Sequence, residues 1–452
     1  MREFPLSSSP LSPATVLAGQ VRSGESTPMA PVEHALAVIE EREPRIRAFV
    51  SVFADEARAE ARAVSLRPDL ATLPLAGVPV AIKDVIAVSG HPMREGSDAT
   101  SSESKTADHP VVARLRAAGA VIVGLTTLPE LAVWGTTDAP GKITRNPWNL
   151  SRTCGGSSGG AAAAVASGMV PLAHGTDGLG SIRIPAANCG VFGIKPGKGV
   201  VPSELGATSW FGMAENGPLA TTVTDAALML SVLADRPELA RIDEPEPLRI
   251  AVAVGSPTVL ARVDSQWRDA TLRVGEELGA SGHSVTPATL PYPVNLLPVL
   301  ARWTAGTAAD AEGLDPRRLQ PRTRRHVAAG RLLRRFVRPE SVVRLEDALL
   351  GFFEDYDVVI TPTLAQPPLV ADAWSERSWS ANLVANVRYA PFTALWNLVG
   401  WPAASVPVGT HPQSGTPLAV QIAAPPGGES TILALAAHIE RVAGWPRFAP
   451  VR

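Results

Sequence analysis

Residues 154–198 limit the folding of this chain most strongly, because they concentrate glycine and serine in two turns. The first turn is GGSSGG at residues 155–160, and the second is GTDGLGS at residues 175–181, with an alanine-rich stretch between them. Glycine is unfavourable inside helices and strands, so its clustering around serines indicates backbone that approaches another group closely. The two turns are therefore candidates for a functional site.

Strand and helix patterns alternate on both sides of these turns. Lys83 ends an apolar strand, VPVAIK, bounded by glycine and proline, at the strand end where α/β sheets place their chemistry. This alternation predicts one large α/β domain wrapped in helices. Further strands are expected at residues 119–124, 248–254 and 356–362, and helices at residues 109–118, 222–234, 265–279 and 430–442.

Composition excludes several classes of function. The chain has 452 residues and a net charge of -2, which gives no reason to expect nucleic acid or an acidic membrane as a partner. Two cysteines, Cys154 and Cys189, make no disulfide framework and fit a reducing cytoplasm. Apolar runs of about 20 residues, a signal-like N-terminus and the HExxH and CxxC patterns are all absent. We expect a cytoplasmic protein without metal or cofactor.

A serine nucleophile needs a base to take its proton. His174 is the histidine nearest to Ser181 in sequence, but it lies at the far end of an expected strand, and a local hydrogen bond is the better interpretation. Lys83 is one of five lysines and is the alternative base, provided that burial lowers its pKa from about 10.4. From composition alone, the favoured interpretation is that Lys83 is not a base and that its side chain reaches solvent or pairs with Asp84.

The glycines of the second turn could serve acyl transfer. The N–H groups of residues 178–181 could stabilise an oxyanion. A phosphate-binding turn is the alternative, but GxxxxGK[ST] is absent, and no GxGxxG follows a strand in this region.

Nine motifs in one order resemble the amidase signature family, and together they extend over most of the chain. They are GVPVAIKD (77–84), DHPVVARLRAAGAVIVG (108–124), TRNPWN (144–149), GGSSGG (155–160), GTDGLGSIRIPAANCGVFGIKP (175–196), ENGPLA (215–220), DVVITPT (357–363), PFTALWNLVGWPAASVP (391–407) and PLAVQIAAPPGGE (417–429).

The resemblance implies a Ser–cis-Ser–Lys triad and a fold with a central mixed, mostly parallel, twisted β-sheet surrounded by helices. By motif, Ser181 is the nucleophile, Ser157 is the bridging serine after a cis peptide bond, and Lys83 is the base. The remaining implied site residues are the oxyanion-binding Gly178, Leu179 and Gly180 and the supporting Asp177, Arg183 and Ser158.

Two positions depart from the family pattern. Leu179 stands where the first glycine of a GG pair is usual, which would strain the backbone if that position needs a positive φ, and its side chain could narrow the acyl pocket. Cys154 replaces a common proline and is expected to be a small buried residue. Trp134, Trp210 and Trp396 are candidates for a pocket wall, although packing in the core explains each of them equally well.

We expect residues 1–70 to form an N-terminal helical segment packed on the core, and residues 71–452 to form the amidase signature domain, with a helical, arginine-rich excursion near residues 291–345. The predicted function is hydrolysis of a linear carboxylic amide through an acyl-serine, by a monomer or homodimer. The alternatives are the A subunit of a glutamine-dependent amidotransferase, which needs partner subunits, a ureido- or biuret-type or biosynthetic amide hydrolase, and a non-enzymatic interaction module.

Overall fold

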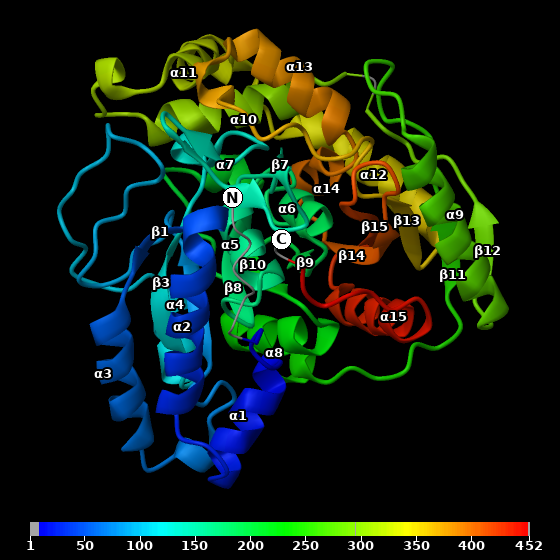
Figure 1. Cartoon of the computed structure of the whole chain (residues 1–452). Coiled ribbons are helices and arrows are strands. Elements are labelled where there is room, and N and C mark those ends of the chain that lie inside the picture. Colours follow the sequence, from blue (N-terminus) through cyan, green and yellow to red (C-terminus); the bar gives the residue numbers. More distant parts are fainter. Residues whose placement is uncertain (1–8, 294, 451–452) are drawn as a thin grey trace.

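A single eleven-stranded sheet runs through the computed structural model, which describes residues 9–293 and 295–450, and helices surround this sheet (Figure 1). In order across the sheet, the strands are β1 (Phe49–Val52), β3 (Val121–Thr126), β2 (Pro79–Lys83), β8 (Leu172–Asp177), β10 (Glu215–Ala220), β9 (Phe192–Lys195), β14 (Ala403–Thr410), β15 (Pro417–Ala423), β13 (Val358–Pro362), β11 (Arg249–Val252) and β12 (Ser284–Pro287).

Two short antiparallel pairs lie outside this sheet, namely β4 (Asp138–Ala139) with β5 (Lys142–Ile143), and β6 (Arg145–Asn146) with β7 (Asn149–Thr153). The helices are α1 (Ala14–Ser23), α2 (Met29–Ile46), α3 (Ala54–Ser65), α4 (Pro110–Ala117), α5 (Gly159–Ala166), α6 (Arg183–Cys189), α7 (Ser209–Gly212), α8 (Val223–Ala234), α9 (Ser265–Ala280), α10 (Leu297–Asp310), α11 (Pro321–Leu333), α12 (Glu340–Asp355), α13 (Trp379–Tyr389), α14 (Ala394–Leu398) and α15 (Glu429–Val442). None of the helices in the described part of the chain is both long and apolar enough to cross a membrane.

The strand directions confirm the expected mixed sheet but correct the expectation that it is mostly parallel. Parallel pairing is confined to the two sides of the sheet, where β2 pairs with β3 and β8, and β11 pairs with β12 and β13. The other neighbouring pairs are antiparallel. In the middle of the sheet, β10 lies between β8 and β9 and runs antiparallel to both.

The N-terminal residues contribute a strand as well as helices. β1 pairs antiparallel with β3 at the edge of the sheet, with Phe49 opposite Thr126. Helix α1 is attached to the core by Asp225 of α8, whose carboxylate accepts hydrogen bonds from the N–H groups of Ala14 and Thr15 at 2.8 and 2.9 Å. These contacts connect segments more than 200 positions apart.

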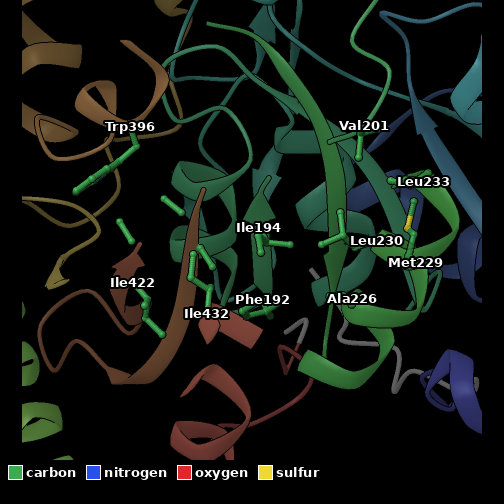
Figure 2. Close-up of a cluster of buried hydrophobic side chains, with 14 of the residues drawn as sticks. Phe192, Ile194, Val201, Ala226, Met229, Leu230, Leu233, Trp396, Ile422 and Ile432 are labelled. Atoms are coloured by element: carbon green, nitrogen blue, oxygen red, sulfur yellow. The ribbon is translucent and has the colours of Figure 1, made fainter. Parts of the chain in front are cut away.

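The core on one side of the sheet forms where β9 meets α8 and α15. Figure 2 shows Phe192 and Ile194 of β9 near Leu230 of α8, with Ile432 of α15 close by, and all four side chains are fully buried. Apolar side chains at helical spacing, such as Ala226 and Leu230, give α8 its buried face. This packing holds the strands whose ends carry the polar residues of the site.

Replacement of Leu230 by alanine should destabilise the protein by about 2–5 kcal/mol, because a cavity in a fully buried position is only partly filled by relaxation. The shift of the urea unfolding transition, followed by circular dichroism, measures this. Leu332→Ala is the matched control in an exposed helical position, 71% accessible, and should change stability by less than about 0.5 kcal/mol. Equal shifts for the two variants would contradict the assignment of this core.

Candidate active site

Two neighbouring parallel strands bring Lys83 to the centre of the site. β2 and β8 pair in parallel, so Lys83 at the end of β2 lies beside Thr176 near the end of β8. The fully buried Lys83 Nζ lies 2.7 Å from Ser157 Oγ and 2.7 Å from Thr176 Oγ1. Ser157 follows a cis Gly156–Ser157 peptide bond, just before α5. The structure thus brings together a lysine and a serine that are far apart in sequence.

Burial changes the chemistry of this lysine. The buried environment lowers the pKa of Lys83 to about 7, although the charge of Asp177 acts in the opposite direction. Burial in a low-dielectric environment disfavours the charged form of an amine, which explains the direction. Lys83 can therefore hold or release a proton near neutral pH, unlike an exposed lysine.

The second serine turn is shaped by Asp177. Its carboxylate accepts the N–H of Gly180 at 2.6 Å and the N–H of Ile182 at 3.2 Å, so the chain bends around this side chain before α6 begins. The N–H of Ser158 donates to the carbonyl of Ser181 at 3.1 Å, which joins the two turns. Ser157 and Ser181 line one small pocket.

Arg183 holds Asp177 in place from within the protein. Its Nε donates to Asp177 Oδ2 at 2.9 Å, and both side chains are fully buried. Its other nitrogens donate to Gln421 Oε1 at 2.7 Å and to Asn397 Oδ1 at 2.6 Å. Burial by itself raises the pKa of Asp177, but the charge and hydrogen bonds of Arg183 and the hydrogen bond from Asn397 hold that pKa well below its usual range.

Ser158 also has a clear structural position. Its hydroxyl donates to the carbonyl of Thr176 and accepts the N–H of the same residue, each at 3.1 Å. Thr176, Asn397 and Gln421 were not predicted as site residues from the sequence. Each lies inside a quoted motif, but a motif does not reveal which of its polar members point into the site.

One of the expected oxyanion donors, the N–H of Gly180, has another partner in the structure, which corrects that prediction. The N–H of Gly180 is already donated to Asp177, so this group is not available to an oxyanion. Gly178, Leu179 and Ser181 remain as expected donors. The positive φ of the turn, +117°, falls on Gly180, and Leu179 is not among the described non-glycine residues with positive φ. Leucine is therefore tolerated at position 179 without backbone strain.

His174, the histidine considered as a base, and the thiol of Cys154 are both buried. Nε2 of His174 lies 2.8 Å from Asn216 Oδ1, and burial lowers the pKa of this histidine to about 3. Burial raises the pKa of the Cys154 thiol to about 12, so the reactive thiolate is not accessible near neutral pH. Within residues 9–293 and 295–450, no group of three or more His, Cys, Asp or Glu side chains is placed to hold a metal ion.

An apolar cavity of about 140 Å³ opens at Ser181. Trp134 and Leu179, both expected near a pocket, line it, and so do Tyr292 and Trp303, which were not predicted from the sequence. No charged side chain is among its described lining residues. The cavity therefore suits an apolar group.

The other two tryptophans considered from sequence lie elsewhere. Trp210 lines the smaller pocket that contains both serines. Trp396 is fully buried, packs against Phe353 with ring centroids 6.4 Å apart, and is not among the described residues that line either pocket. Its large side chain contributes to the core, which was the alternative interpretation.

The fold and the lysine–serine arrangement together define an amidase-type protein. The chain belongs to the Amidase family, whose family model matches residues 30–433. A protein of Mycobacterium tuberculosis (strain ATCC 25618 / H37Rv) named as an amidase, AmiB2, is 40% identical, with 97% of each chain covered. An acylamidase of Rhodococcus erythropolis is 34% identical, with 96% of this chain and 95% of the relative covered.

Solved structures agree with this assignment. The structure of 6-aminohexanoate cyclic dimer hydrolase in complex with its substrate aligns with a TM-score of 0.87 at 28% identity, covering 97% of this chain and 98% of that one. The resemblance to the amidase signature family is thus confirmed, as is the predicted amidase activity, the hydrolysis of amide C–N bonds.

Replacement of Gly180 by alanine should reduce kcat/KM for an amide by about 100-fold or more, because the turn that carries Ser181 must shift. A Cβ at position 180 would collide with the Thr393 side chain, and the backbone has φ +117°. Gly199→Ala is the control, since Gly199 also has a positive φ, +77°, but no atom lies within 4 Å of an added Cβ. Steady-state amide hydrolysis compares the variants, and equal losses would contradict a special role for Gly180.

Proposed function

We propose that Ser181 is the nucleophile of this amidase, Ser157 its bridging serine and Lys83 its general base. The observation that carries the proposal is the 2.7 Å separation between Lys83 Nζ and Ser157 Oγ, in a buried setting that lowers the pKa of Lys83 to about 7. A general base works best when its pKa lies near the working pH and its partner lies within hydrogen-bond reach. Both conditions hold for Lys83.

The reaction then proceeds in two halves. Neutral Lys83 accepts the proton of Ser157, which accepts that of Ser181, and Ser181 attacks the amide carbonyl. The oxyanion is stabilised by backbone N–H groups of residues 178, 179 and 181, which are preorganised by the Asp177–Arg183 pair. The same serine returns the proton to the leaving nitrogen, and water hydrolyses the acyl-serine.

The apolar cavity supports an uncharged acyl group as the substrate. Its volume of about 140 Å³ is close to that of an engineered cavity known to bind benzene, so a phenyl ring or a short alkyl chain fits. Free glutamine carries an ammonium and a carboxylate, and burial of unpaired charges is costly. The uncharged lining therefore argues against the amidotransferase alternative, and it also disfavours the polar ureido and biuret substrates.

Ser181→Ala should lower kcat for amide hydrolysis by about 10⁴-fold or more, because removal of the nucleophile disables the whole triad. The variant should also lose covalent labelling by a fluorophosphonate, measured by the mass of the intact protein. Ser65→Ala, in an exposed position of α3, is the control and should label like the unmodified protein. Equal labelling of Ser181→Ala would exclude Ser181 as the nucleophile.

The activity should depend on pH through Lys83. Since burial lowers the pKa of Lys83 to about 7, the base is protonated below that pH, and kcat/KM should fall as the pH decreases from about 8 to 5. The substrate should be a neutral amide, because it does not ionise between about pH 5 and 8 and so does not itself change kcat/KM with pH. Burial also raises the pKa of nearby Glu95 to about 7, so the profile is measured for Glu95→Gln as well, and the acid limb that remains in this variant reports Lys83. A flat profile would argue against lysine as the base.

A further inference from the structure

A second, smaller pocket meets the apolar cavity at the nucleophile. Its volume is about 30 Å³, and Ser181 is the one described lining residue that it shares with the apolar cavity. A cavity needs about 10–15 Å³, measured in the same way, to hold one water molecule, so the pocket has room for a molecule of the size of water or ammonia. The two pockets thus offer the two sides of an amide very different amounts of space.

The position of the bridging serine, Ser157, indicates which half of the substrate faces each pocket. Ser157 lines the small pocket and is not among the described residues that line the apolar cavity. In the mechanism proposed above, on which this step rests, Ser157 returns the proton to the leaving nitrogen, so that nitrogen must come within hydrogen-bond reach of its hydroxyl. The leaving group therefore faces the small pocket, and the acyl group faces the apolar cavity.

The walls of the small pocket are held in an uncommon backbone conformation. Left-handed conformations are costly for residues other than glycine and persist where the surrounding structure enforces them, often at active sites. Four lining residues adopt such a conformation, with positive φ values of 51°, 51°, 56° and 51° at Glu95, Leu131, Ala132 and Trp210.

Two acidic side chains reach the small pocket, and they differ in their hydrogen bonds. Both carboxylate oxygens of Asp310 are occupied, by the N–H of Ala207 and by Nε1 of Trp210, each at 2.8 Å. The carboxylate of Glu95 has no hydrogen-bond partner within the described part of the chain, whereas its backbone is bonded to Asp84 and Leu131. Glu95 is therefore the group that can accept an N–H from a molecule in the pocket.

We propose that the small pocket is the leaving-group subsite, that it takes ammonia, and that Glu95 accepts an N–H of the departing nitrogen. The substrates are then primary amides of apolar acids. As the C–N bond of the tetrahedral intermediate breaks, the nitrogen takes the proton of Ser157, and Lys83 returns its proton to Ser157. The products of this half-reaction are the acyl ester of Ser181 and ammonia, whose place water takes for deacylation.

The unmodified protein provides the first test. The kcat/KM values are compared for benzamide, N-methylbenzamide and benzanilide. The same comparison is made for the primary amide, the N-methyl amide and the anilide of hexanoic acid. The primary amide should be preferred over the N-methyl amide by about 100-fold or more, since the pocket beside Ser157 has a volume of only about 30 Å³. Hydrolysis of the anilide at a rate equal to or above that of the primary amide would overturn the proposal.

The second test isolates Glu95. Glu95→Gln keeps the size of the side chain but loses the charged acceptor, so kcat/KM for the primary amide should fall about tenfold or more. Labelling of Ser181 by a fluorophosphonate, which expels fluoride and needs no ammonia subsite, should fall far less. Glu103→Gln, in an exposed position, is the matched control. Parallel losses in hydrolysis and labelling would mean that Glu95 acts only in folding, and would overturn its assigned role.

These measurements also separate this proposal from the proposed triad. If Ser181 is labelled but N-substituted amides are preferred, the triad stands and the ammonia subsite fails. If Ser181 is not labelled and neither series of amides is hydrolysed, the triad itself fails, and the leaving-group assignment fails with it.

Discussion

The buried pair of Asp177 and Arg183 is the interaction on which the rest of the site depends. The carboxylate closes the turn of the second serine, and the guanidinium extends from it to side chains of α14 and β15. Buried ion pairs are seldom a net source of stability, but removal of one partner leaves an uncompensated charge and is strongly destabilising. The main effect of this pair is geometric, because it joins strand β8, the turn and the C-terminal part of the sheet into one rigid unit.

The same pair helps to explain why Lys83 can be neutral. The negative charge of Asp177 acts on Lys83, yet its carboxylate is engaged by Arg183 and by backbone N–H groups. Lys83 has two hydroxyl neighbours, Ser157 and Thr176, rather than a carboxylate in contact. Hydroxyls stabilise an ammonium ion less than a carboxylate does, so the desolvation of Lys83 is not offset.

The sequence was sufficient for the parts of the site that lie in continuous motifs. Lys83, Ser157 and Asp177 could be placed because each occupies a fixed position within a run of glycines or an apolar strand. The antiparallel insertion of β10, the use of the Gly180 N–H by Asp177, and the role of Thr176 could not be inferred, since they depend on three-dimensional contacts. The pocket walls were missed for the same reason, because Tyr292 and Trp303 come from a segment without a motif.

One helix, α10, contributes to both pockets. Trp303 lines the apolar cavity, and Asp310, seven positions later, lines the small pocket and bonds to Trp210. Residues seven apart share one face of a helix, so the same face of α10 bounds both halves of the substrate. An insertion of one residue between them would rotate the following positions by about 100°. The length of α10 between Trp303 and Asp310 therefore fixes how the wall of the small pocket is oriented relative to the wall of the apolar cavity.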